Sequence, residues 1–485
     1  MKKERILEII NYFENKYPVD KWVYRGIDMW PILRIYLYYN LTSISANKSI
    51  VSNEELKKNH FDCKKIKPSF FGKTLRKISS LLRILKFLYD RRVNYIFFGA
   101  DSHRFWENGR YANKFFEPLI SRSSIEAESV ILEYDGYTNR NRYSETVVNV
   151  VDFSDMFVRL IRLFKKEKIN YSFKDYNLFL NELESIFGDR LSFFSRNDLQ
   201  LIVEKVYLKY KFYHLYFKNV KPKVVFYLCY YANNDVFASL AAANMLQIKT
   251  IEIQHGPITY PHPAYSQWFS IKNNAHNTLP SNFWCWDKYS ENEIKKWSSG
   301  TIINTKVVGN FSLISQRHKY SNLKKDNSYF LYSLQTYPYR INDFFPTSII
   351  NLIKQLEVPW IIRLHPRDNI GKEVYDKFFE RNQLTNLIEI HDAKNVPLMM
   401  DLSRTKLHFT NYSGTVLEAL ELNIPTVILS ETGANFFKDL LDEEIIKYIN
   451  SNDSNFIERV NEFYLSLPNI QLSNEVKEIV DVRIL

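Results

Sequence analysis

The stretch TKLHFTNYSGTVLEALELNIPTVILS, residues 405–430, has the pattern of a strand, a polar turn, a helix and a second strand. Such a unit aims the free N–H groups of the helix start above the sheet, and the helix dipole favours an anion there. Ser413 and Thr415 add hydroxyl donors, and Gly414 lets a ligand approach the backbone closely. Glu418, one turn further on, could accept hydrogen bonds from a ribose. The stretch therefore predicts a site for a phosphate joined to a nucleoside, unless Ser413 only caps an ordinary helix.

Short apolar runs alternate with helical patterns on both sides of this stretch. Strands that alternate with helices form parallel sheets, and a chain of 485 residues is too long for one core. We therefore expect an α/β protein with two doubly wound, Rossmann-like domains that face each other across a cleft. The predicted parts are an N-terminal helical segment (1–90), a first domain (91–285), a bridge (286–325), a second domain (326–450) and a helical tail (451–485).

In the second predicted domain, polar side chains follow the strands at what would be one edge of a parallel sheet, where ligands bind. His365 comes directly after the strand that contains Arg363, and Pro366 fixes the turn. Cations and hydroxyls at a helix N-terminus would neutralise a phosphate leaving group without a metal ion. The predicted nucleotide-binding set is Ser333, Gln335, Arg363, His365, Arg367, Ser413, Gly414, Thr415 and Glu418.

The first predicted domain offers candidates for a general base. His255 lies at the end of a strand, between Gln254 and Gly256, and imidazole is a common general base. Glu133 and Asp135 end another strand, and either carboxylate could accept a proton from an acceptor hydroxyl. The alternatives are an imidazole that is hydrogen-bonded within the cleft and surface carboxylates in a turn.

Composition and missing motifs exclude several classes of protein function. The sequence has no P-loop, nucleophile elbow, HExxH, dinucleotide GxGxxG or D-x-D motif. The formal charge of +11 indicates an anionic partner, but no nucleic-acid-binding motif accompanies it. Three widely spaced cysteines favour a reducing compartment, and we find neither a signal peptide nor a long apolar segment. We therefore expect a cytoplasmic protein.

Residues 73–92, KTLRKISSLLRILKFLYDRR, form a basic amphipathic pattern. Its leucines and isoleucines recur on one side of a helix, and seven lysines and arginines crowd the remainder. Such a helix could dock on anionic lipid, which would make the protein peripheral to the inner membrane. The alternative is a helix that faces the core and exposes a solvated basic side.

With these residues assembled, the chain resembles bacterial GT-B glycosyltransferases of capsule, O-antigen and lipooligosaccharide biosynthesis. The segment IEIQHGPITYPHPAY, residues 251–265, is similar to the Gln-His-Gly segment of capsule biosynthesis enzymes. RLHP (363–366) and NYSGTVLEAL (411–420) are similar to the His-Pro and Ser motifs of sialyl-, polysialyl- and Kdo transferases. LEYDG (132–136) resembles the acidic motif of sialyltransferases, although Tyr134 stands at its first acidic position unless Glu133 takes that part.

The resemblance implies transfer of a sugar from a nucleotide donor to an oligosaccharide or glycolipid acceptor, with no metal. The donor would bind the second domain, with His365, Ser413 and Thr415 on the phosphate, and a CMP-activated acid sugar is favoured over a UDP-hexose. The acceptor hydroxyl would be deprotonated in the first domain by His255, Glu133 or Asp135. The alternatives are a polyol-phosphate transferase, a UDP-sugar 2-epimerase-like isomerase and a non-catalytic glycan-assembly protein.

Overall fold

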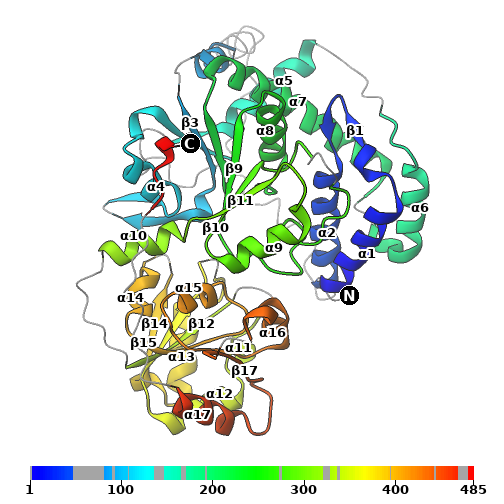
Figure 1. The fold of residues 1–485 in the computed structure, drawn as a ribbon. Coiled ribbons are helices and arrows are strands. Elements are labelled where there is room, and N and C mark those ends of the chain that lie inside the picture. The colour runs from blue at the N-terminus through cyan, green and yellow to red at the C-terminus, as the bar shows by residue number, and fades with distance from the viewer. Residues whose placement is uncertain are drawn as a thin grey trace, which may run out of the picture. The chain divides into compact units, whose positions relative to one another are not determined.

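The computed structural model in Figure 1 describes most of the chain. The described residues are 3–46, 81–89, 93–107, 109–135, 147–164, 171–191, 194–271, 276–319, 328–335, 339–366, 368–393, 395–441, 444–467 and 479–484. They form two compact units, the first of residues 1–103 and 124–307 and the second of residues 104–123 and 308–485.

The first unit is built on a parallel sheet of seven strands in the order β7-β6-β3-β8-β9-β10-β11. Their bounds are β3 (Tyr95–Gly99), β6 (Ser129–Glu133), β7 (Val147–Asn149), β8 (Val224–Tyr227), β9 (Lys249–Ile253), β10 (Asn282–Cys285) and β11 (Asn304–Val307). The chain runs outward from β3 to β7, then returns to place β8 on the other side of β3. This reversal makes the carboxyl ends of β3 and β8 a topological switch point, where ligands bind in doubly wound folds.

Helices cover this sheet, and the central strands are apolar throughout because both of their faces are buried. The helices are α1 (Lys3–Lys16), α2 (Trp30–Ala46), α5 (Val150–Phe164), α6 (Tyr176–Phe187), α7 (Arg196–Val220), α8 (Asn234–Met245) and α9 (Lys288–Ser298). The N-terminal helices share one continuous core with the rest of the unit. A two-stranded ribbon, β1 (Val23–Tyr24) and β2 (Ile27–Asp28), separates α1 from α2.

A buried ion pair joins the N-terminal helices to the loop that follows β9. Arg34 of α2 pairs with Glu14 of α1, and both side chains are fully buried. The Arg34 guanidinium also donates to the carbonyl oxygens of Pro263 and Ser266 at 2.9 Å each. Glu14 accepts from the backbone N–H of Ser270 at 2.6 Å. The N-terminal segment thereby fixes the loop that begins with the Gln-His-Gly residues.

The second unit is built on a parallel sheet of six strands in the order β14-β13-β12-β15-β16-β17. Their bounds are β12 (Tyr329–Ser333), β13 (Trp360–Leu364), β14 (Ile388–Asp392), β15 (Thr405–Thr410), β16 (Thr426–Ile428) and β17 (Ile446–Tyr448). The chain again runs outward from its first strand and returns on the other side, so the switch point lies between β12 and β15.

Alternating residues of each central strand enter two separate cores, one on each face of this sheet. On one face pack α12 (Thr347–Leu356), α13 (Lys372–Arg381) and α17 (Phe456–Ser466). On the other pack α10 (Phe311–Lys319), α14 (Leu398–Leu402) and α15 (Thr415–Glu421). The remaining helices are α11 (Ile341–Phe344) and α16 (Glu431–Phe436).

Residues 104–123 add a hairpin and a helix to the second unit, although they lie far from it in the sequence. The hairpin is β4 (Arg104–Glu107) and β5 (Arg110–Asn113), and α4 (Phe116–Ser123) follows it and contacts α10. The N–H of Val482 donates to the Ser123 hydroxyl at 3.0 Å. This segment is therefore held by residues that come some 200 and 360 positions later, counted from 123 to 311 and to 482.

The predicted fold class is confirmed: two doubly wound parallel sheets with an N-terminal helical segment. The stretch predicted as a bridge, 286–325, contains α9, β11 and α10. The predicted domain boundaries and the cleft stay predictions. No helix in the part of the chain that the structure describes is long and apolar enough to cross a membrane.

Candidate functional site

Four polar residues of the second sheet lie in one row at the carboxyl ends of adjacent strands. Ser333 pairs with Arg363 on one side and with Thr410 on the other, and Arg363 pairs with His391. Adjacent strands are about 4.8 Å apart, so the loops after β13 and β15 start about 10 Å from each other, on either side of β12. That separation is on the scale of a nucleotide.

The polar turn after β15 is tied to the end of β12. Thr410 Oγ1 accepts from the Ser413 N–H at 3.0 Å and from Gln335 Nε2 at 2.9 Å. The hydroxyls of Ser413 and Thr415 are 3.1 Å apart, and the Thr415 N–H donates to Ser413 Oγ at 3.3 Å. Gln335 is only 4% exposed, and its Oε1 has no hydrogen-bond partner among the residues that the structure describes. The turn thus gathers two hydroxyls and an amide oxygen at the switch point.

Close packing against α16 fixes the backbone of this turn. The carbonyl oxygen of Asn411 accepts from the Ser430 hydroxyl at 3.0 Å. A Cβ placed on Gly433 would lie 1.8 Å from that same oxygen, so only glycine fits at this position. The turn is therefore held in place from the side opposite to Gln335.

Glu418 lies in a charged cluster on the face of the sheet covered by α14 and α15. Burial raises its pKa to about 7, although Lys114 and Arg363 favour the ionised form. Asn310 Nδ2 donates to Glu418 Oε1 at 3.3 Å. Burial also lowers the pKa of Lys114, which follows β5, while the Glu418 charge opposes that change. Beside the polar turn, Glu418 is thus hydrogen-bonded to Asn310 and lies within the electrostatic influence of Lys114 and Arg363.

A second carboxylate holds Arg363 within this cluster. One guanidinium nitrogen, Nη1, donates to the Val396 carbonyl at 3.0 Å and to Asp401. Asp401 is fully buried and also lies 2.6 Å from His391 Nδ1. Arg363 is therefore held in place by the protein itself.

The other predicted donor residues have different surroundings. The Ser333 hydroxyl is buried and lies 3.1 Å from Nε2 of His408, whose pKa is lowered to about 3 by burial. This serine thus connects strands within the sheet. His365 is half-buried directly after β13, and its carbonyl accepts from the Asp368 N–H at 2.8 Å. Arg367 lies outside the described residues.

In the first unit, His255 lies beside a buried carboxylate that the sequence analysis did not single out. Its Nδ1 is 3.6 Å from Glu252 Oε1 and has no hydrogen-bond partner in the described part of the chain. Glu252 accepts from the N–H groups of Cys229 and Tyr230, and from the Tyr265 hydroxyl at 2.8 Å. Burial raises the pKa of Glu252, and His255 opposes this rise. The geometry suits an imidazole that is oriented by a carboxylate.

The neighbours of His255 come from the switch point of the first sheet. His103 follows β3 and its ring centroid is 5.3 Å from that of His255, while the Tyr231 ring, after β8, is 6.3 Å away. Nε2 of His262 forms a hydrogen bond of 3.1 Å with the Tyr231 hydroxyl. Burial lowers the pKa of His262 to about 3. The His255 side chain is partly exposed at this edge, with 15% of its surface accessible.

The two acidic candidates of the first unit differ in exposure. β6 ends at Glu133, which is fully buried and pairs with Gly99. Asp135 is exposed and accepts from the Asp101 N–H at 3.1 Å. Because β6 ends at Glu133, Asp135 lies beyond the strand. The alternation of side chains between the two faces of a strand therefore does not apply to this pair. The structure thus presents Asp135, rather than Glu133, to solvent.

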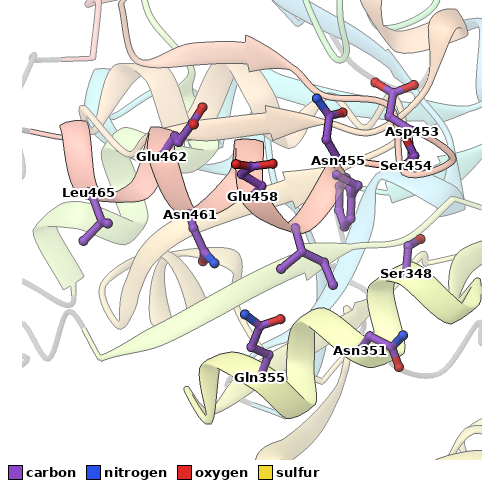
Figure 2. A pocket seen from close by; sticks show the side chains of 12 residues that line it. Ser348, Asn351, Gln355, Asp453, Ser454, Asn455, Glu458, Asn461, Glu462 and Leu465 are labelled. Carbon is purple, nitrogen blue, oxygen red and sulfur yellow. The ribbon is translucent and has the colours of Figure 1, made fainter.

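A hollow of about 800 Å³ lies between α12 and α17 of the second unit (Figure 2). Its lining includes Ser348, Asn351, Asp453, Glu458 and Glu462. These helices cover the face of the sheet opposite to α14 and α15, and none of the predicted site residues lines the hollow. Residues of this hollow therefore serve as control positions for substitutions in the candidate site.

The sequence analysis missed Glu252, Lys114 and Asn310. A signal existed for Glu252, because it is a charged residue inside the apolar run 250–253, and such residues are buried only when partnered. No local signal marks Lys114 or Asn310, since they come 304 and 108 residues before Glu418 in the sequence. In the described residues, no group of three His, Cys, Asp or Glu side chains is placed to hold a metal ion together.

The fold and these residues define an α/β protein with a polar cluster at the switch point of each sheet. No protein-family model matches the chain, and no curated protein matches it. Among solved structures, UDP-GlcNAc 2-epimerase from Neisseria meningitidis bound to UDP-GlcNAc is 16% identical over 78% of this chain and 94% of that chain, with a TM-score of 0.46.

Two further solved structures show the same level of similarity. UDP-GlcNAc 2-epimerase from Methanocaldococcus jannaschii, in complex with UDP-GlcNAc and UDP, is 15% identical over 79% of this chain and 95% of that chain, with a TM-score of 0.44. Medicago truncatula UGT71G1 complexed with UDP-glucose is 9% identical over 78% of this chain and 91% of that chain, with a TM-score of 0.39. All three TM-scores are below 0.5, so these similarities do not indicate a function.

Proposed function

We propose that this protein is a glycosyltransferase that moves a sugar from a nucleotide-activated donor to an oligosaccharide or glycolipid acceptor. The donor nucleotide binds the second unit, and the acceptor hydroxyl is activated in the first. One observation carries the proposal: the Ser413–Thr415 hydroxyls lie at the switch point of a parallel sheet, and Glu418, which is hydrogen-bonded to Asn310 and influenced by the charges of Lys114 and Arg363, follows in the same helix.

The chemistry of this cluster suits a nucleoside phosphate. A carboxylate such as Glu418 accepts hydrogen bonds from ribose hydroxyls, which are donors that a free phosphate lacks. Lys114 and Arg363 supply positive charge, and the hydroxyls of Ser413 and Thr415 donate to phosphate oxygens. Gln335 Oε1, which has no hydrogen-bond partner among the described residues, offers an acceptor for a donor group of the ligand.

In the proposed reaction, His255 removes the proton from the acceptor hydroxyl as its oxygen bonds to the anomeric carbon of the donor sugar. The bond between that carbon and the phosphate oxygen breaks, and the nucleotide leaves with the electron pair. Glu252 orients the imidazole and stabilises its protonated form. Lys114, Arg363 and His365 neutralise the charge of the departing phosphate, so the proposed transfer needs no divalent metal.

The proposed donor is a CMP-activated acid sugar, with a UDP-hexose as the alternative. A CMP-activated sugar leaves as a monophosphate, whose charge matches a small cationic cluster. Thermal unfolding in the presence of CMP, UDP, CDP and GDP ranks the nucleotides, because each stabilises the fold in proportion to its occupancy. We expect CMP to give the largest shift in Tm. A larger shift with UDP would overturn the choice of base and leave the transferase proposal standing.

Matched variants test the site itself. Glu418→Gln and a Ser413→Ala/Thr415→Val double variant should abolish the nucleotide-dependent shift. Glu458→Gln, in the hollow of Figure 2, is a carboxylate control on the other face of the same sheet and should leave the shift unchanged. Equal losses in test and control variants would contradict the donor site.

Product analysis then separates a transferase from the other functions. With donor and acceptor present, a transferase forms a glycosylated acceptor and free nucleotide in equal amounts. Incubation with a UDP-sugar alone yields an epimer or free UDP only if the protein is an isomerase. Two results together would identify a non-catalytic assembly protein. The first is a donor that binds but gives no product with any acceptor fraction. The second is a His255/His365 double variant that restores the surface glycan in cells from which the protein has been deleted.

A further inference from the structure

Helix 81–89 of the first unit carries more apolar side chains than its contact with the core buries. Ile84 and Leu88 are buried, at 2% and 1% exposure. Phe87 stacks on Phe153 of α5 and Tyr216 of α7, with ring centroids 4.4 and 4.7 Å away. These three side chains dock the helix on the unit and account for one face of it.

Four more apolar side chains of this helix point to solvent. Leu81, Leu82, Leu85 and Tyr89 are 48%, 61%, 42% and 66% exposed. At about 100° per residue, these four positions span an arc of about 100° next to the buried face. Isolated exposed leucines are common on protein surfaces, but four on one side of a nine-residue helix form a continuous patch.

Positive charge borders this patch. Arg83 and Lys86 occupy the remaining side of the helix, at about 200° and 140° on the same helical wheel. The sequence adds Lys73, Arg76, Lys77, Arg91 and Arg92 on either side, of which residues 73–80 and 90–92 lie outside the described part of the chain. Helices that lie in the headgroup region of anionic bilayers have this composition, with leucine and tyrosine next to lysine and arginine.

We propose that Leu81, Leu82, Leu85 and Tyr89 insert into an anionic lipid surface, with Arg83 and Lys86 at the headgroups. Charge argues for lipid over a second copy of the chain, because two copies of this patch would bring like charges together. The inference is independent of the donor site and concerns where the protein works.

Flotation of the full-length protein with lipid vesicles tests this surface. The vesicles contain phosphatidylcholine alone, or with about one third phosphatidylglycerol, at low and high salt. A Leu82→Ser/Leu85→Ser variant should lower binding by more than about tenfold, and Arg83→Gln/Lys86→Gln by about 25-fold at low salt. The controls are Leu178→Ser and Leu465→Ser, which remove leucines that are 61% and 81% exposed elsewhere.

The expected result is salt-sensitive binding to the anionic vesicles, lost in both helix variants and kept in both controls, with Tm unchanged throughout. Failure of the unmodified protein to float with anionic vesicles would overturn the proposal. So would a change from dimer to monomer in the leucine variant without any change in flotation, because the patch would then face a second copy. None of these outcomes depends on nucleotide binding.

Discussion

Replacing Glu418 by glutamine should stabilise the free protein at pH 8 and leave its stability at pH 4.5 almost unchanged. The pKa of Glu418 rises from 4.5 in the unfolded chain to about 7 in the folded protein because the carboxylate loses water on burial. Between these two values the folded protein holds a proton that the unfolded chain has released. The free energy of unfolding therefore falls as the pH rises through this window and is lowest above about pH 7.

The size of the effect follows from the shift in pKa. A rise in the pKa from 4.5 to about 7 corresponds to at most about 3 kcal/mol. Because the residue is only partly buried, we expect about 2 kcal/mol, which is roughly 4–8 °C in Tm for a unit of this size. Glutamine keeps the shape and carries no charge, so this cost disappears at high pH.

Thermal unfolding of both proteins between pH 4.5 and 8.5 measures the difference. The two curves of Tm against pH should nearly coincide at pH 4.5 and separate steadily from there to about pH 7, with the variant more stable at the alkaline end. Glu458→Gln serves as the control and should run parallel to the unmodified protein. A constant offset at every pH, or a variant that is less stable at pH 8, would refute the account of Glu418 as a buried, destabilising carboxylate.

Four further outcomes are expected. His255→Ala should lower kcat about 10²–10⁴-fold at unchanged nucleotide affinity, measured by initial rates and calorimetry. Glu252→Gln should lower kcat roughly 10- to 100-fold and displace the acidic limb of the pH–rate profile, because the Glu252 carboxylate, 3.6 Å from His255 Nδ1, favours the protonated imidazole by its charge. His365→Ala should weaken nucleotide binding about tenfold or more, and full binding would remove His365 from the donor site. Arg34→Met should cost about 3–5 kcal/mol in chemical denaturation, and additional removal of the Glu14 charge should recover part of that loss.

Much of the fold follows from patterns within short windows. Runs such as YIFFG (95–99) and WIIRL (360–364) are apolar because parallel strands are buried on both faces, and both runs are strands in the two sheets. The polar residues that follow such strands also meet at one sheet edge, because parallel strands share their direction. Local pattern and sheet geometry therefore suffice to bring Ser333, Arg363 and Thr410 into one row.

The identity of each partner depends on contacts that no local pattern encodes. Arg363 was predicted to face a phosphate, and in the structure Asp401 and the Val396 carbonyl engage it. Ser333 was predicted as a ligand contact, and its hydroxyl lies beside the buried His408. The sequence alone does not distinguish a side chain that has partners within the protein from one that is available to a ligand. The difference depends on burial and contacts, which arise only when the unit is folded.

The assignment of residues 104–123 to the second unit has a consequence for synthesis and for engineering. During translation the hairpin and α4 emerge early, but α10 and Val482, which hold them, emerge much later. Lys114 therefore reaches Glu418 only once nearly the whole chain has been made. A fragment that starts at residue 308 would lack this lysine, so cutting the chain between the two units should yield a nucleotide site without one of its cations.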